Sequence, residues 1–323
     1  MAPTYTWEIT KPDGTKLSGS GAAADVFADL PGIYGVTYEA SADRACPPIP
    51  VSVSSGVNVN PSVTMSANPS SIPAKTDWPA MPDYSFSLIS VTPHPPTCEV
   101  TLAIVALESD QGYVPPDGGE LVQLSPNVWK YTAFEEPQTE KCAKPVTVTI
   151  AAFMGTMEMA QINVLVFPVH DWWTLNSHQH GPGGQTHPTD VDDFTNAYHY
   201  LRWKYATVLA TTGGTFSGPP TISPNACVKC PPLVGPCVAA CTTCIPVLGC
   251  STTLGTQTFT GSENAAASII GHELIHTTGG NECVAYAWEF IHDTTTGIFQ
   301  CDALYHANVV QQVNCTCNGI GCP

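Results

Sequence analysis

The sequence has few charged residues, and few of those are basic. Lys and Arg together number 10 of 323 residues, whereas Asp and Glu number 27, which leaves a formal net charge of −17. A surface of this sign repels phosphate groups instead of releasing their counterions. We therefore expect neither a nucleic acid nor an anionic membrane as a partner.

Long apolar runs are also missing. No stretch approaches the ~18 consecutive apolar residues that a spanning helix needs, and the first residues have neither the basic start nor the apolar segment of a secretory signal. We therefore expect no membrane insertion. The chain is nevertheless 43% hydrophobic and only 11% charged. This balance is the opposite of that in disordered chains and predicts a folded protein.

Cysteine, in contrast, is abundant. The chain has fourteen cysteines, six of them between Cys227 and Cys250. Such a density suits an oxidising compartment. We expect a secreted, extracellular protein whose export signal is not part of this sequence.

The cysteine spacing suggests several pairings. Two CxxC pairs inside the 227–250 cluster have the form of a zinc ribbon, but their separation is short for one and two further cysteines intervene. We therefore predict disulfides and no metal in this cluster. Cys98 and Cys142 are predicted to pair, Cys283 is predicted to bond to the tail (301–322), and Cys46 has no evident mate in its own module.

The sequence of the first half of the chain predicts two β modules. Alternating apolar and polar residues separated by turn clusters predict a small β-sandwich over residues 1–56 and a second over 57–168. The segment PGIYGVTYEA resembles a strand of PKD-like and other immunoglobulin-like modules. In the second module the expected strands are 84–91, 98–107, 128–133, 146–153 and 157–166.

Residues 169–323 read as an α+β domain. Acidic residues after Thr189 open an expected helix, and a Pro- and Cys-dense segment (219–250) is expected to be irregular. A strand is expected over 253–260. Ser262 is a candidate N-cap for a helix over 263–278, which Gly279 and Gly280 end, and a second helix is expected to start from Asn281.

The helix over 263–278 contains the pattern HExxH. Residues i and i+4 lie on one helical face, so His272 and His276 can reach one Zn²⁺ ion. Glu273 is then placed to act as the general base that takes a proton from water. The sequence therefore predicts a zinc site with hydrolytic chemistry.

The residues after HExxH resemble those of zincin metallopeptidases. The string HELIHTTGGNE resembles the metzincin pattern HExxHxxGxxH with Glu282 in place of the last histidine, and ECVAYAWE resembles the ExxA element of gluzincin-like proteins. Either resemblance implies Glu282 as the third zinc ligand. No methionine follows Met159, so the Met-turn of metzincins is absent and the branch of the zincins stays open.

Other residues remain candidates. Asp302, in GIFQCDALY, lies in a segment similar to the aspzincin motif GTxxDxxY, and Glu289 lies two turns beyond Glu282 on the same helical face. Further candidate ligands are His292 and His306.

The loop residues His178, His180 and His187 are either ligands of a second metal or solvated, and Tyr286 either stabilises an oxyanion or packs in the core.

These observations predict two immunoglobulin-like sandwiches followed by a zincin-like domain. The function they imply is that of a secreted zinc endopeptidase acting on protein or peptide substrates, which pair with the strand at 253–260. After Lys229 the last 94 residues contain no Lys or Arg, which suits survival among proteases. The alternatives are a surface or adhesive protein whose β modules associate with a cell surface or with copies of the chain, and a hydrolase of non-peptide substrates.

Overall fold

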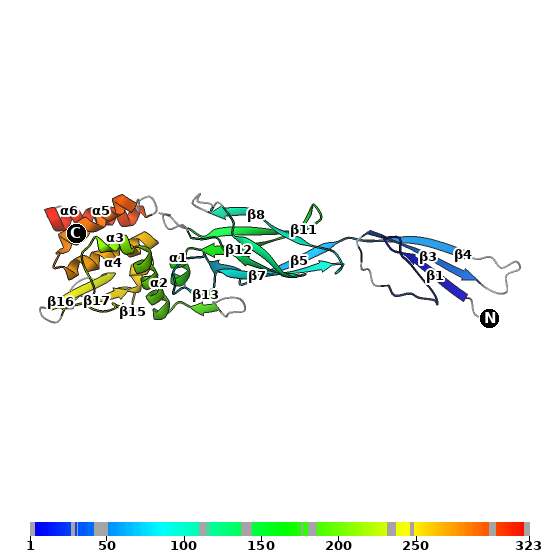
Figure 1. Cartoon of the computed structure of the whole chain (residues 1–323), viewed down its shortest axis with the longest axis horizontal. Helices are drawn as coiled ribbons and strands as arrows, with labels where there is room; N and C mark the ends of the chain where they lie inside the picture. Colours follow the sequence, from blue (N-terminus) through cyan, green and yellow to red (C-terminus); the bar gives the residue numbers. More distant parts are fainter. Residues whose placement is uncertain are drawn as a thin grey trace.

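The computed structural model describes residues 4–26, 30, 32–41, 51–109, 115, 117–136, 144–175, 177–179, 186–230, 237–245, 249–296 and 302–319. Figure 1 shows three units in a row along the long axis, with the N-terminus and the C-terminus at opposite ends. Two units are built of β-sheets, and the third contains the helices. No helix in the described part of the chain is both long and apolar enough to cross a membrane.

The first unit is a single antiparallel sheet in the order β2-β1-β3-β4. Its strands are β1 (Thr4–Thr10), β2 (Lys16–Ser20), β3 (Gly32–Ser41) and β4 (Val51–Val59). The described residues therefore form one sheet here and not the two sheets of the expected sandwich. The expected boundary at residue 56 falls inside β4, where Val57 pairs with Tyr34 of β3.

The second unit is a β-sandwich of two four-stranded sheets, in the orders β5-β7-β10-β9 and β6-β12-β11-β8. The strands are β5 (Ser62–Asn68), β6 (Ser71–Pro73), β7 (Phe86–His94), β8 (Thr101–Ser109), β9 (Glu120–Ser125), β10 (Val128–Thr132), β11 (Val146–Met154) and β12 (Met157–Phe167). All five strands expected in this module are present, with ends shifted by at most three residues. The alternation of apolar and polar residues predicts these strands well because one face of each sheet is buried against the other sheet.

The predicted disulfide between Cys98 and Cys142 is wrong, since Cys98 is a free thiol. Cys142 itself lies outside the described residues, as do Cys46 and His180. The register explains the error. Cys98 precedes the start of β8, whereas the start of β11 at Val146 pairs with Ser109 at the other end of β8. Antiparallel pairing therefore carries the chain before β11 to the far end of the sheet.

The third unit combines helices with a small sheet in the order β15-β17-β16. Its elements are α1 (Val169–Thr174), β13 (Ser177–Gln179), β14 (Thr186–Pro188), α2 (Val191–Lys204), α3 (Ala206–Ala210), β15 (Thr221–Ser223), β16 (Ala240–Ile245), β17 (Gly249–Gly255), the 3₁₀ turn η1 (Thr256–Phe259), α4 (Glu263–Thr277), α5 (Glu282–Thr296) and α6 (Ala303–Asn318). The expected boundary at 168/169 falls directly before α1.

Two expectations for this unit are wrong. The segment 219–250 is not irregular, because it contains β15 and β16, and the strand expected over 253–260 ends at Gly255, where η1 begins. That strand, β17, is the central strand of its sheet, and Thr253 and Leu254 are paired with β15 on one side and with β16 on the other. Among the described strands, the free edges of this sheet belong to β15 and β16. A substrate strand therefore cannot pair with β17 as predicted.

The second and third units share one hydrophobic core. Trp78, from the sandwich, packs among buried residues of α1, α2 and α4, and its ring lies 5.7 Å from that of Tyr200 on α2. Trp172 of α1 is fully buried in the same cluster and contacts Tyr84 of the sandwich. Because apolar area buried between the units stabilises their association, they form one continuous body.

A buried lysine joins the sandwich to the first turn of α4. Lys204, the last residue of α2, places its Nζ 2.7 Å from Glu136 Oε1 and 2.7 Å from Glu263 Oε1. Glu136 follows β10 in the sandwich, and Glu263 is the first residue of α4. Burial by itself lowers the pKa of Lys204, but the two carboxylates raise it more, to about 12, so the ammonium group stays charged.

The remaining oxygen of Glu136 is also satisfied. Glu136 Oε2 accepts hydrogen bonds from Tyr200 Oη at 2.9 Å and from the backbone N–H of Val169 at 2.9 Å. Tyr205 Oη donates to Glu263 Oε1 at 2.8 Å. Because buried charges that are paired and hydrogen bonded cost much to separate, this network fixes the start of α4 against the sandwich.

The cysteine cluster forms disulfides, as predicted. The pairs are Cys227–Cys237, Cys230–Cys241 and Cys244–Cys250. A fourth disulfide joins Cys283, at the start of α5, to Cys317 near the end of α6, which confirms the predicted bond between Cys283 and the tail. These crosslinks constrain β16 and α6, the two elements that flank α4 (Figure 1).

Candidate metal centre

The centre of the third unit is helix α4, which carries the HExxH residues. Ser262 is its N-cap, because the Ser262 side chain accepts a hydrogen bond from the backbone N–H of Ala265. Gly271 allows α5 to pack closely, since a Cβ atom at this position would lie 2.0 Å from the ring of Trp288. The helix is almost entirely buried. It therefore presents its histidines from a fixed scaffold.

His272 and His276 lie one turn apart on α4 and face each other. Their Nε2 atoms are 3.1 Å apart, and His272 is 7% exposed. The chain then turns at Gly279, whose φ of +85° is in the left-handed region that favours glycine. This turn starts α5 directly beside the end of α4, so that Glu282 meets both imidazoles.

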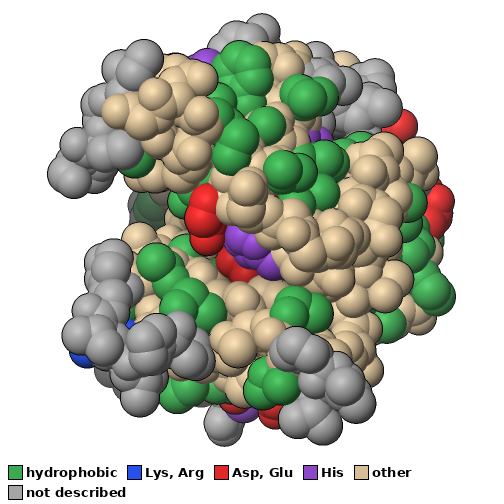
Figure 2. All heavy atoms as spheres, turned by 90° about the vertical axis from the view of Figure 1, so that its left-hand side faces the viewer, with side chains coloured by type: hydrophobic (Ala, Val, Ile, Leu, Met, Phe, Trp, Pro, Cys, Tyr) green, Lys and Arg blue, Asp and Glu red, His purple; other side chains and the backbone are tan. Residues whose placement is uncertain are grey.

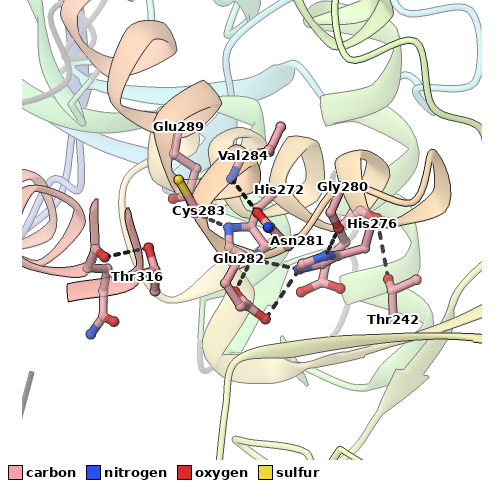
Figure 3. A network of polar contacts seen from close by, with 12 residues as sticks. Thr242, His272, His276, Gly280, Asn281, Glu282, Cys283, Val284, Glu289 and Thr316 are labelled. Carbon is pink, nitrogen blue, oxygen red and sulfur yellow. Dashed lines mark hydrogen bonds and ion pairs between the residues drawn. The ribbon is translucent and has the colours of Figure 1, made fainter. Parts of the chain in front are cut away.

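Glu282 completes a triangle of donor atoms (Figure 3). Its Oε2 lies 3.2 Å from His272 Nε2, and its Oε1 lies 3.5 Å from His276 Nε2. The three side chains form a cluster that could hold a metal ion, with all ligand atoms within 4.8 Å of one another. Tetrahedral zinc with bonds of about 2.0–2.2 Å requires ligand separations of about 3.3–3.6 Å. One observed separation, 3.5 Å, lies within this range, and the other two, 3.1 and 3.2 Å, lie just below it, so the donor set is close to what one metal ion requires.

Hydrogen bonds to the other ring nitrogens set the tautomers of both histidines. His276 Nδ1 lies 2.9 Å from the carbonyl oxygen of Gly280, which can only accept, so Nδ1 carries the proton. His272 Nδ1 lies 2.5 Å from Glu289 Oε1, and it donates to that carboxylate. When the rings are neutral, the lone pairs of both Nε2 atoms and the carboxylate of Glu282 converge on one point. A cation at that point would be coordinated by all three groups.

The electrostatics of the cluster point the same way. Burial alone lowers the pKa of His272, but hydrogen bonds with Glu282 and Glu289 raise it more, to about 10. The hydrogen bond with His272 in turn lowers the pKa of Glu282. The surroundings therefore favour positive charge where the three donor atoms meet. A cation bound at this point would supply such a charge.

Glu273, the predicted general base, lines the same cleft and is not part of the triangle. It is 4% exposed, and its Oε2 atom is buried without a hydrogen-bond partner in the described part of the chain. Burial raises the pKa of Glu273. A raised pKa makes a carboxylate a better proton acceptor at neutral pH. The structure thus places next to the donor triangle a carboxylate that is free to take a proton.

The triangle lies in an open cleft of about 550 Å³. In Figure 2, histidine and acidic side chains gather at the bottom of a hollow on the end of the molecule that faces away from the β modules. The walls are β16 and the preceding residues on one side, and α5 and α6 on the other. Such an opening gives an extended chain access to the three donor atoms.

The other predicted ligands have different roles. Asp302 caps α6, since its side chain accepts from the backbone N–H of Tyr305. Glu289 orients His272, as described above. His292 is buried against Trp288, and His306 stacks on Phe290. None of these four belongs to the donor triangle.

The remaining candidates divide between the core, the surface and the cleft. His178 is 2% exposed, with Nε2 3.3 Å from Asp193 Oδ1, so it is a core residue and not a solvated one. His187 lies on the exposed strand β14. Tyr286 lines the cleft, and its ring is 4.5 Å from that of His272. It is therefore positioned near the triangle, not in the core.

Three parts of the site were not predicted from the sequence: Tyr305, the Gly280 carbonyl and the wall formed by β16. Tyr305 donates a short hydrogen bond to Glu289 Oε2, so α6 supports the residue that supports His272. The Gly280 carbonyl orients His276, and β16 forms one wall. The sequence contained one related signal, the two-turn spacing from Glu282 to Glu289. This spacing indicates that both residues lie on one helical face, but it does not indicate which residues that face contacts.

No family model and no curated protein matches this chain. Among solved structures it is similar to extracellular cadherin domains 3–6 of protocadherin gamma B2, with 12% identity, a TM-score of 0.26, and coverage of 51% of this chain and 39% of that one. The extracellular domain of protocadherin gamma B4 matches with 14% identity and a TM-score of 0.23, over 52% of this chain and 26% of that one. The chain thus spans well under two thirds of either, and similarity this low carries no argument about function.

Proposed function

We propose that this chain is a secreted zinc-dependent endopeptidase of the zincin type. The observation that carries the proposal is the cluster of His272, His276 and Glu282. The two Nε2 atoms lie 3.1 Å apart, Glu282 Oε2 lies 3.2 Å from His272 Nε2, and Glu282 Oε1 lies 3.5 Å from His276 Nε2. The buried carboxylate of Glu273 lies beside this cluster in an open cleft. Two imidazoles, one carboxylate and a neighbouring general base are the donor set of a catalytic zinc site that keeps one position open.

The chain's own residues have separate roles in the reaction. A zinc ion held by His272, His276 and Glu282 would act as a Lewis acid that polarises the scissile carbonyl and acidifies a water molecule. Glu273 accepts a proton from the attacking water and returns it to the leaving amine. Tyr286, on the wall beside His272, is placed to donate a hydrogen bond to the oxygen that gains charge.

The shape of the site favours an endopeptidase. β16 is an edge strand of its sheet, and residues 238–242 line the cleft. An extended substrate can add to this free edge through main-chain hydrogen bonds. Glu282 is the first residue of α5, which supports the gluzincin-like form, in which the third ligand comes from the following helix.

The disulfides support action outside the cell. Four disulfides are present among the described residues, and three of them brace β16 and its approach. Disulfides of this density persist in oxidising compartments. The functional form is therefore expected to be the oxidised one.

The test combines zinc content with turnover of a generic unfolded protein. Wild type is expected to bind one zinc per chain and to cleave the substrate. Glu273→Gln is expected to keep its zinc and to lose at least about 10²-fold in kcat/KM, because a proton acceptor is removed and no ligand is. Glu282→Ala is expected to lose zinc as well, and Glu108→Gln, at an exposed site on β8, serves as the control.

Two results would contradict the proposal. Full activity of Glu273→Gln excludes the assigned base. Protein that contains no zinc and takes up none on titration excludes the peptidase, and the β modules would then be the functional part, as in a surface or adhesive protein.

A further inference from the structure

The cleft has two walls of different chemistry. The β16 side consists mostly of small side chains and backbone, among them Ala239, Ala240 and Thr242, and Gln257 of η1 also lines the cleft. The opposite side includes Asn308 and Gln312 of α6. In Figure 1, β16 and α6 lie on opposite sides of α4, and Figure 2 shows the hollow between them. A peptide added to the edge of β16 would therefore present every second side chain toward α6.

Away from the proposed metal site, the described lining of the cleft offers no charged group to a substrate side chain. No Lys, Arg or Asp lines it in the described part of the chain. Its three glutamates are already committed, since Glu282 contacts both histidines, Glu289 is bonded to His272 and Tyr305, and Glu273 is buried. Away from the proposed zinc ion and its ligands, an acidic substrate side chain finds no cation in the described lining, and a basic one finds no carboxylate without another partner or role.

Carboxamides are the hydrogen-bonding groups left for a substrate side chain on the α6 wall. Asn308 and Gln312 are four residues apart on α6, so they lie on one helical face. Their side-chain amides make no hydrogen bond within the described residues, and both line the cleft. Gln311, one residue before Gln312, is exposed and does not line it. The two amides thus present free donors and acceptors to whatever occupies the cleft.

We infer that Asn308 and Gln312 determine substrate preference, selecting an uncharged, hydrogen-bonding side chain (Ser, Thr, Asn or Gln) on an extended peptide bound between β16 and α6. This inference rests on the proposed peptidase function. Alternate side chains of a strand point to the same side, so the selection applies to one substrate position and not to its immediate neighbours. Each amide hydrogen bond contributes roughly a 2- to 13-fold preference.

The experiment uses the full-length, zinc-loaded protein and a library of internally quenched peptides in which one position at a time is varied. Wild type is expected to show one position where Ser, Thr, Asn or Gln gives about 10-fold higher kcat/KM than Leu, Lys or Glu. In the double variant Asn308→Leu/Gln312→Leu the same position is expected to prefer aliphatic side chains. Zinc content is expected to stay at one per chain.

Two further variants keep the test interpretable. Asn308→Ala/Gln312→Ala removes the amides without adding apolar bulk and is expected to abolish the preference, because kcat/KM for the Ser, Thr, Asn and Gln peptides falls to the level of the Leu peptide. Gln311→Leu is the matched control and is expected to behave as wild type. Each variant is compared with wild type in thermal unfolding, so that a folding defect is recognised.

The outcomes separate the two proposals. If wild type cleaves no peptide, the peptidase function is wrong and this inference falls with it. If wild type cleaves peptides without a polar preference at any position, or if the double variants keep the wild-type preference, this inference alone is overturned.

Discussion

Glu289 on α5 holds His272 on α4 through a contact of 2.5 Å between Glu289 Oε1 and His272 Nδ1. Tyr305 of α6 donates to the other oxygen of the same carboxylate. Three helices therefore support one imidazole of the proposed metal site, and the disulfide Cys283–Cys317 connects two of these helices. A carboxylate in this position fixes the ring orientation and raises the basicity of the nitrogen that faces the metal.

Glu289→Gln is expected to weaken zinc binding by about 10- to 100-fold, because an amide orients the imidazole less strongly than a carboxylate does. The measurement is competition for zinc with a chelator of known affinity, and Glu108→Gln is the control. The substitution removes no ligand, so zinc-saturated protein should regain most of its activity. Unchanged zinc affinity would show that this contact does not act on the metal.

Lys204→Met is expected to destabilise the protein by about 3–5 kcal/mol. The change leaves the buried carboxylates of Glu136 and Glu263 without their shared cation. The free energy of unfolding is measured in urea. Lys229→Met, at an exposed lysine, is the matched control and should unfold as wild type does.

The same substitution tests whether the sandwich positions α4. If the network fixes the start of α4, Lys204→Met should also lower zinc affinity under conditions where the protein is still folded, and Lys204→Arg should restore part of it. A loss of stability with unchanged zinc affinity would limit the network to a structural role.

His292 predicts how stability depends on pH. Both ring nitrogens of His292 are buried without hydrogen-bond partners in the described part of the chain, and its ring stacks 5.2 Å from that of Trp288. Burial lowers the pKa of His292 from 6.5 to about 4. As pH falls from about 6.5 to 4, the unfolded chain takes up this proton before the folded one does, so stability is lost in that window.

His292→Phe keeps the stacking and removes the titration. The variant is expected to lose less stability than wild type between pH 6.5 and pH 4, by on the order of 2–3 kcal/mol. Unfolding is measured in urea on zinc-free protein with a chelator present, so that metal release does not contribute. His199→Phe, at an exposed histidine of α2, is the control, and parallel curves for wild type and His292→Phe would contradict the assignment.

Local patterns in the sequence predicted the strands, the helix ends and the three donor residues, because these features depend on residues that are close along the chain. Periodicity identified the strands of the sandwich, and the N-cap at Ser262 and the glycines after α4 located both helices of the site. The spacing of His272, His276 and Glu282 placed three donor groups within reach of one another, because helix and turn geometry act over a few residues. The structure brings these three together.

Contacts between residues that are far apart in the sequence were determined only by the tertiary structure. Which strand has a free edge depends on how β15, β16 and β17 pair, and the free thiol of Cys98 follows from the register of β8 against β11. The contacts of Glu289 with Tyr305 and of Lys204 with Glu136 join residues 16 and 68 positions apart. Residue spacing carries no information about such contacts, because they form only when whole elements pack and exclude water.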